Sequence, residues 1–160
     1  MPDQNNKELT LVRVFDAPRE MVWEAWTDPK LISQWWGPQN VTAPFDQMDV
    51  DARVGGNINI VMVAGKELGQ MAGMKWPMTG KFTEVTKPEK LVYTATAIMN
   101  DKPVLLTHTT VTFEEEGGKT KMTVHILVTK TLIGSEGALA GMKMGWTQQV
   151  DKLAEFLVTS

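Results

Sequence analysis

Residues 119–130 read KTKMTVHILVTK, and this stretch shows most clearly how the chain is built. Met122, Val124, Ile126 and Val128 share one face of this segment, opposite Lys121, Thr123 and His125. This period of two is typical of a β-strand that has one face on a hydrophobic core. Because Gly117-Gly118 precedes the strand and provides a turn, we predict a hairpin with the segment before it.

The same period extends back to Val41. We predict six strands at roughly 41–51, 57–65, 74–86, 90–100, 105–115 and 119–130. Turn residues separate them at Gly55-Gly56, Lys87-Pro88-Glu89, Asn100-Asp101-Lys102-Pro103 and Gly117-Gly118. Connections this short favour an antiparallel meander. Between Gly65 and Gly73 we expect a loop.

The segments on either side of the meander predict one more strand and three helices. Glu8–Asp16 is rich in apolar and β-branched residues and predicts a first strand. Two short helices follow, the first after Pro18 and the second capped by Asp28, and Gly37-Pro38 ends the second.

The last 25 residues have helical period. Apolar residues step by three or four positions at Leu139, Met142, Trp146, Val150, Leu153 and Leu157. We assign the remaining helix surface to Gln148, Gln149, Asp151, Lys152 and Glu155. This long helix is the one predicted element able to cover the apolar face of the meander.

The predicted fold is therefore α+β. A curved seven-stranded antiparallel sheet has two short helices after its first strand and a long C-terminal helix over its concave face. We expect a single domain over residues 1–160, with residues 1–7 as a mobile tail.

Composition excludes several classes of function. The net charge of -3 provides no basic field for nucleic acid or anionic lipid, and no apolar run is long enough to span a membrane. The polar N-terminus lacks the apolar core of a signal peptide, so we expect a cytoplasmic protein. Cysteine is absent, which excludes disulfides and thiol chemistry. The 6 Trp and 11 Met are plentiful, and such side chains are common on surfaces that receive apolar ligands.

Several motifs, in order along the chain, resemble one known family. They are Phe15-Asp16-Ala17-Pro18, Val22-Trp23, Trp35-Trp36-Gly37-Pro38, Asp51-Ala52-Arg53-Val54-Gly55-Gly56, Gly80–Val85, Pro88–Val92, Lys119–Thr123 and Gly145-Trp146. This pattern resembles the helix-grip domains related to the activator of the ninety-kilodalton heat-shock chaperone's ATPase. The wider superfamily includes START domains, plant pathogenesis-related proteins and polyketide cyclases, and the resemblance implies a tunnel for apolar molecules between sheet and long helix. Fold alone does not decide function.

The two histidines are the first candidates for catalysis or metal binding. A hairpin turning at Gly117-Gly118 places Thr110 opposite His125 and Leu127 opposite His108. The histidines then share the polar face of the sheet, which we interpret as the solvated one. Without a carboxylate at ligand spacing, this pair does not predict a metal site.

Carboxylates are the second candidates. Asp49 and Asp51 lie two residues apart on one predicted strand and are a conceivable acid–base pair. Asp51 also fits the turn motif, with Arg53 as its partner. The chain has no nucleophile elbow, P-loop or dinucleotide fingerprint, so we name no catalytic residue and expect no cofactor.

Aromatic residues and glycines are more informative. Trp35 and Trp36 are adjacent, so we expect one in the core and the other at the rim of an opening. Gly137, Gly141 and Gly145 recur every four residues in the long helix, although each costs about 1 kcal/mol relative to alanine. This row of three glycines without side chains has three possible explanations. It leaves room for a ligand, it allows the helix to pack closely on the sheet, or the helix begins only after Gly141. Met142 and Met144 would suit an adaptable lining.

The leading hypothesis is a non-catalytic binder of an apolar small molecule. Its predicted contacts are Trp36, Met62, Trp76, Tyr93, Gly141, Met142, Gly145 and Trp146. One alternative is a protein-interaction module that stimulates a chaperone ATPase, which predicts an exposed apolar patch. The other is a cyclase or hydrolase-like enzyme, which predicts a histidine or carboxylate inside the cavity.

Overall fold

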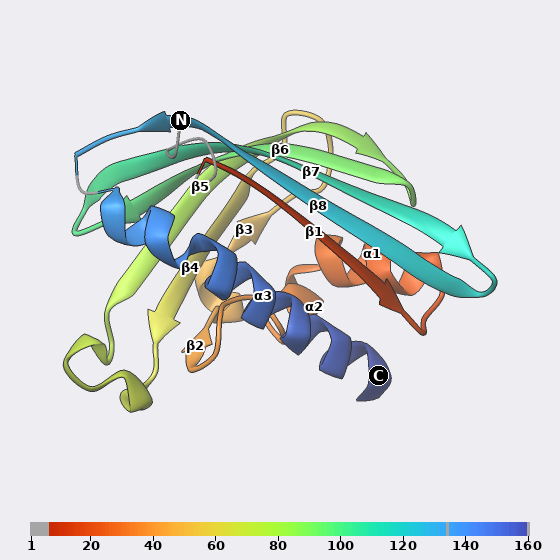
Figure 1. The fold of residues 1–160 in the computed structure, drawn as a ribbon, viewed down its shortest axis with the longest axis horizontal. Helices are drawn as coiled ribbons and strands as arrows, with labels where there is room; N and C mark the ends of the chain where they lie inside the picture. Colours follow the sequence, from red (N-terminus) through yellow and green to blue (C-terminus); the bar gives the residue numbers. More distant parts are fainter. Residues whose placement is uncertain (1–6, 134, 160) are drawn as a thin grey trace.

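The computed structural model describes residues 7–133 and 135–159 (Figure 1). The strands are β1 (Glu8–Phe15), β2 (Val41–Thr42), β3 (Asp49–Val50), β4 (Ile58–Ala64), β5 (Lys75–Thr86), β6 (Lys90–Met99), β7 (Lys102–Glu116) and β8 (Lys119–Thr131). The helices are α1 (Arg19–Thr27), α2 (Pro29–Ile32) and α3 (Glu136–Thr159), and two 3₁₀ segments are η2 (Phe45–Gln47) and η3 (Lys66–Met71).

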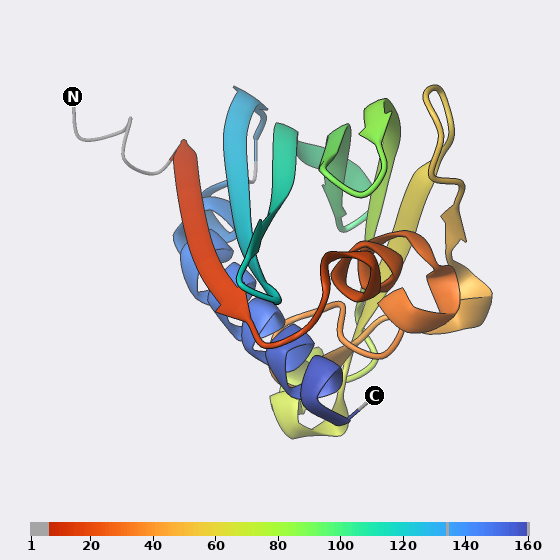
Figure 2. The ribbon, with the colours of Figure 1, turned by 90° about the vertical axis from the view of Figure 1, so that its right-hand side faces the viewer.

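The strands form one antiparallel sheet in the order β1-β8-β7-β6-β5-β4-β2, and the short β3 pairs with β4. The sheet curls, with α3 across its concave side and α1 and α2 at one end of the same side (Figures 1 and 2). Consecutive strands from β4 to β8 are neighbours, as short connections require. The predicted helix-grip architecture, with seven strands along the main path of the sheet, is confirmed.

The register of the last hairpin explains which face is buried. Thr110 lies opposite His125, and His108 lies opposite Leu127, as predicted from the turn. The alternate residues point to the concave side, where Val111, Phe113, Met122, Val124 and Ile126 are buried. Buried residues of the α3 stripe, Val150, Leu153 and Leu157, belong to the same core cluster.

The expected strand over 41–51 is wrong, because the chain there is broken into β2, η2 and β3. Pro44 follows β2 and has no backbone N–H, so it cannot continue the hydrogen-bond ladder. The expected loop between Gly65 and Gly73 contains η3. At the same end of the sheet as η3, β7 begins at Lys102, because Asn100 and Asp101, both at positive φ, turn the chain in two residues.

The helical segment before β2 is shorter than predicted. Asp28 caps α2 by accepting a hydrogen bond from the Lys30 N–H at 3.0 Å, but α2 ends at Ile32. Trp35 and Trp36 follow in a turn, and they are 0% and 4% exposed. Trp35 thus lies in the core, while Trp36, also shielded from solvent, borders the opening between the sheet and α3. Trp35 is held inside because its Nε1 donates to the Ala25 carbonyl at 2.8 Å.

α3 starts at Glu136, so all three glycines of the row fall within it and a helix that begins after Gly141 is excluded. The second half of α3 is hydrogen-bonded to the loop that follows α2. Lys152 Nζ donates to the carbonyls of Gly37 and Val41, each at 3.0 Å, and burial lowers the pKa of Lys152. The Gly37 N–H donates to Gln149 Oε1 at 2.9 Å. These bonds fix how α3 lies over the sheet.

Candidate functional site: an apolar cavity under the long helix

A cavity of about 510 Å³ lies between the concave face of the sheet and α3 and is partly open to solvent. Its wall combines side chains of β4 to β8, the segment after α2, η3 and the first half of α3. All eight residues predicted from the sequence line it: Trp36, Met62, Trp76, Tyr93, Gly141, Met142, Gly145 and Trp146. The volume falls in the range of roughly 300–1,000 Å³ that small-molecule sites occupy.

One part of the wall is a cluster of tryptophans. The rings of Trp36 and Trp146 meet edge to face at 5.7 Å between centroids, and Trp26 stacks on Trp146 at 6.1 Å. The indole ring of Trp26 is held in place by β8, since its Nε1 donates a hydrogen bond to Met122 Sδ at 3.2 Å. Rings that hold each other in this way form a rigid apolar surface for a ligand.

The glycine row provides open space. A Cβ added at Gly141 would meet no atom within 4 Å, and one at Gly145 would only touch Pro38 Cβ at 4.0 Å. Close packing against the sheet is therefore not the reason for Gly141. Since any larger side chain on this side of α3 would enter the cavity, the two glycines enlarge it.

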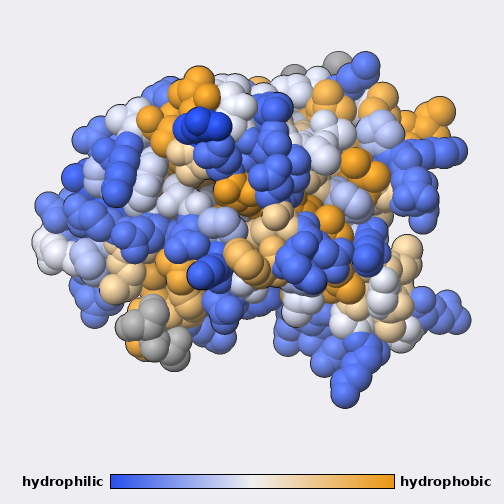
Figure 3. Space-filling model, turned by 180° about the vertical axis from the view of Figure 1, so that it is seen from behind, coloured by the Kyte–Doolittle hydropathy of each residue, from blue (hydrophilic) through white to orange (hydrophobic). Residues whose placement is uncertain are grey.

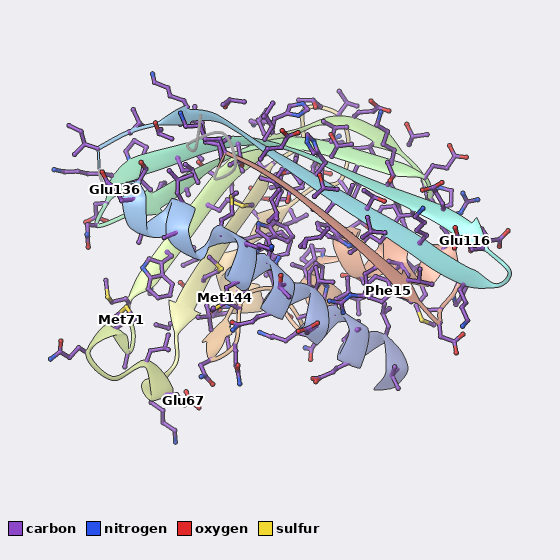
Figure 4. The ribbon with its side chains drawn as sticks, in the orientation of Figure 1. Phe15, Glu67, Met71, Glu116, Glu136 and Met144 are labelled. Atoms are coloured by element: carbon purple, nitrogen blue, oxygen red, sulfur yellow. The ribbon has the colours of Figure 1, made fainter. Side chains whose placement is uncertain are left out.

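Two methionines behave differently from one another. Met71, from η3, lines the cavity and is 46% exposed, which places it at the open side (Figure 4). Met144 is 67% exposed and does not line the cavity, so its expected role as a lining residue is wrong. Helical spacing explains this, because Met144 lies two residues from both Met142 and Trp146 and therefore faces the roughly opposite side of α3.

Sequence reasoning missed the polar part of the wall. Thr107 and Thr109 of β7 line the cavity, and so does Gln149, which had been assigned to the helix surface. Gln149 is only 5% exposed, because its Oε1 turns inward to accept the Gly37 N–H. The loop that supplies this N–H is far away in sequence, so no local pattern could have found the contact.

Three polar side-chain atoms of the described residues are fully buried and have no hydrogen-bond partner, and the residues that carry them contribute to the wall. They are Trp76 Nε1, Tyr93 Oη and Gln149 Nε2. Burial raises the pKa of the Tyr93 phenol far above its ordinary value, and the neighbouring Thr109 side chain opposes this weakly. No hydrogen bond of good geometry joins these two hydroxyls. Tyr93 therefore stays protonated and able to donate.

The histidines and the acidic pair lie outside the cavity. His108 and His125 are on the outer face of the sheet, as predicted, and His125 Nε2 pairs with Glu8 Oε1 at 2.6 Å. Asp49 accepts a hydrogen bond from Asn57, and Asp51 pairs with Arg53 at 2.6 Å, as the turn motif implied. Within the described chain no three His, Asp or Glu side chains gather as a metal site would need.

The turn that contains Asp51 also explains its double glycine. A Cβ on Gly56 would lie 2.0 Å from the Asp51 carbonyl oxygen, so no other residue fits. The D-x-R-x-G-G pattern thus builds the connection between β3 and β4 and does not serve chemistry. Among residues 7–133 and 135–159 no helix has the length and hydropathy of a membrane span.

Comparison with known families agrees with this geometry. Residues 16–158 match the family model described as Activator of Hsp90 ATPase homolog 1-like protein. The chain belongs to this family. The match begins directly after β1 and extends into the last turn of α3, so the Activator of Hsp90 ATPase homolog 1-like family includes every element that forms the cavity. No curated protein sequence matches the chain.

Solved structures of bacterial proteins share the architecture of this Activator of Hsp90 ATPase homolog 1-like chain. A Chromobacterium violaceum protein is 25% identical, with a TM-score of 0.78 and 98% of each chain covered. The AHSA1 protein of Silicibacter pomeroyi is also 25% identical, with a TM-score of 0.77, 95% of this chain and 98% of that chain covered. An Arthrobacter aurescens protein is 24% identical, with a TM-score of 0.81, 99% of this chain and 90% of the other covered. The chain therefore has the helix-grip fold of the START and Bet v1-like superfamily.

Proposed function

We propose that this protein binds an apolar small molecule in the cavity under α3, without catalysing a reaction on it. The observation that carries the proposal is the cavity of about 510 Å³, whose wall is mostly apolar and aromatic with a few polar groups. Ligand pockets have this composition, because apolar walls supply affinity and a few polar groups fix orientation.

The nature of the wall supports binding over catalysis. None of the described lining residues is a histidine, a carboxylate or another charged group. General acid–base catalysis at neutral pH needs such a group within hydrogen-bond reach of the substrate. The cyclase or hydrolase-like alternative predicts a histidine or carboxylate here, and the wall has neither; the Tyr93 phenol is held protonated, because burial raises its pKa.

The family description also suggests a chaperone ATPase or another protein as partner. An interaction module of that kind would present a contiguous apolar patch. Large exposed apolar side chains of the described residues lie on several elements, among them Val14 on β1, Phe45 on η2 and Val158 at the end of α3. In the view from behind, hydrophobic groups are interrupted by hydrophilic ones (Figure 3). The cavity is therefore the better supported site.

The test is a thermal-shift screen of delipidated protein against neutral and acidic apolar compounds, together with tryptophan fluorescence, since Trp36, Trp76 and Trp146 line the cavity. A ligand at 100 times its Kd adds about 2.7 kcal/mol, which is about 8 °C for a chain of this length. The cavity variant is Gly141→Leu, which places a side chain in the open space.

The matched control is Ala140→Leu, which adds a similar bulk at the neighbouring exposed position of α3, outside the wall. Saturable binding that Gly141→Leu abolishes and Ala140→Leu retains supports the proposal. A folded wild type that binds no compound, or binding that both variants retain, contradicts it.

A further inference from the structure

The accessible side chains of the cavity wall include aromatic rings and thioethers from three elements. The strand side is lined by Met62 of β4 and by Trp76 and Met78 of β5, and α3 contributes Met142 and Trp146. All of them are half-buried, so each keeps surface that a bound molecule can cover. A ligand in this cavity is therefore within reach of sulfur atoms and ring surfaces.

Strand pairing joins the residues of the strand side into one surface. Met62 lies directly opposite Trp76, and Met78 follows two residues later on the same face of β5. Directly opposite and diagonal residues on one face of a sheet are within reach of each other when their side chains are long. The indole of Trp76 and the two thioethers are therefore neighbours along one side of the cavity.

Small residues form the floor of the cavity on β6 and its side on α3. Ala95 and Ala97 of β6 both line the cavity, since residues two apart in a strand share a face. On α3 the lining residues Ala138, Gly141 and Gly145 are three and four positions apart, which makes one stripe roughly 10 Å long. Side chains this short leave smooth surfaces, against which a flat molecule can lie over a broad area.

A flat aromatic molecule gains more from this wall than an alkyl chain does. A contact between a thioether and an aromatic ring, or between two aromatic rings, raises affinity by roughly twofold to tenfold beyond the effect of buried area. An alkyl chain makes neither contact. It also loses the rotational freedom of each bond that the cavity fixes, whereas a fused ring system has no such freedom to lose. Trp36 and Trp146 already hold each other edge to face at 5.7 Å, so a ligand does not have to order them.

We infer that the ligand of this cavity has a flat, fused-ring aromatic skeleton. The ring system lies on Ala95 and Ala97, and its edges reach the α3 stripe on one side and the thioethers of Met62 and Met78 on the other. This inference deepens the proposed function and depends on it, because it names the chemical class of the apolar ligand.

The experiment compares primary alcohols that have the same number of carbon atoms and differ only in the skeleton. One set is 2-naphthalenemethanol, its decahydro analogue and 1-undecanol; the larger set is 9-anthracenemethanol, its perhydro analogue and 1-pentadecanol. Affinities in the smaller set are measured by isothermal titration calorimetry. In the larger set 9-anthracenemethanol is followed by energy transfer from the cavity tryptophans, and the saturated members are measured by displacing it.

In at least one set the aromatic member is expected to bind about threefold or more tightly than either saturated member. Buried apolar area alone predicts the opposite order, because the alkyl chain has the most surface to remove from water. The comparison therefore distinguishes ring contacts from a general hydrophobic effect.

The decisive variant is the double substitution Met62→Leu, Met78→Leu, which removes both sulfur atoms at nearly constant volume. Affinity for the aromatic member should fall by about threefold to tenfold, while affinity for the saturated members should change less than twofold. The matched control is Met74→Leu, since Met74 is 37% exposed and does not line the cavity. Methyl NMR spectra of the wild type give a second measurement: the methionine methyl groups of Met62 and Met78 should show ring-current shifts with the aromatic member that the saturated members do not cause.

The outcomes separate the two proposals. Saturated members that bind as tightly as the aromatic member in both sets overturn the inference while leaving apolar binding in place. An aromatic preference that the double variant retains, with no ring-current shift at Met62 or Met78 in the wild type, overturns it as well. If no compound of either set binds to the folded wild type, the proposed function fails and the inference fails with it.

Discussion

Replacing Gly141 by alanine should stabilise the protein. Gly141 lies within α3, five residues after its start, where glycine costs about 1 kcal/mol relative to alanine because its backbone loses more freedom on folding. A Cβ at this position meets no atom within 4 Å, so no clash opposes the gain. The full helix-propensity difference should therefore appear in the free energy of unfolding.

The corresponding change in melting temperature follows from the size of the chain. An unfolding entropy of about 2.1 cal/mol/K per residue gives about 340 cal/mol/K for 160 residues. A gain of about 1 kcal/mol then raises Tm by about 3 °C. Differential scanning calorimetry of the delipidated protein measures both Tm and the enthalpy, and urea unfolding gives an independent free energy.

Gly145 and Gly80 provide the comparison. Gly145→Ala should give a similar increase, since the nearest atom, Pro38 Cβ, would be 4.0 Å away. Gly80→Ala should have the opposite effect, because its Cβ would lie 1.9 Å from the Thr94 carbonyl oxygen of the neighbouring strand. Overpacking of this kind costs about 1–3 kcal/mol, or up to about 9 °C here.

A lower Tm for Gly141→Ala would refute the reasoning, since it would mean that α3 is not helical at this point or that the space beside it is filled. An increase would show that glycine at 141 lowers the stability of the free protein. Such a residue is understandable if the space it leaves is used by a ligand, as stability and function commonly compete at binding sites.

Three further predictions concern single groups. Tyr93 is the only tyrosine, so phenolate absorbance reports its raised pKa directly. The Tyr93 phenol should stay protonated in the folded protein well above pH 10 and should titrate near pH 10 in urea. The free energy of unfolding should therefore fall as pH rises above 10. Lys152→Ala should lower the free energy of unfolding in urea by about 2 kcal/mol, because two loop carbonyls lose their donor, whereas Lys143→Ala on the exposed side of α3 should change it little. Because burial lowers the pKa of Lys152, the stability of the wild type should also rise as pH increases from below that pKa toward 10.5. The Lys152→Ala variant should lose this rise. Arg13→Ala removes the ion pair with Asp151 at 2.8 Å, and because both side chains are about a third exposed or more, the loss in urea unfolding should be at most about 0.5 kcal/mol and should vanish at 1 M salt.

Local sequence patterns were sufficient for the sheet and for the apolar wall of the site. Alternation in 119–130, together with the Gly117-Gly118 turn, determined the register of β7 and β8, because the side-chain period of a strand leaves no other way to bury Met122, Val124 and Ile126. The helical stripe placed Met142 and Trp146 against the sheet. Tyr93 and Met62 were predicted as contacts of the same ligand, and all four residues line the cavity.

Local patterns failed where a residue's surroundings come from distant parts of the chain. Gln149 was assigned to the surface of α3, yet it is buried because the Gly37 N–H, 112 residues earlier, bonds to it. Sequence did not show which of Trp35 and Trp36 borders the opening; Trp36 does, and Trp146 packs on it. Neither contact has a counterpart in the period of its own segment.

The sequence by itself thus determined the elements, their order and the apolar face that each turns inward. These depend on interactions between near neighbours, which the spacing of residue types records. Only the tertiary structure decided that the inward faces leave about 510 Å³ unfilled and that Trp76, Tyr93 and Gln149 each bury a polar atom without a partner. Volume and hydrogen-bond satisfaction are sums over side chains from many elements, so they exist only once the chain has folded.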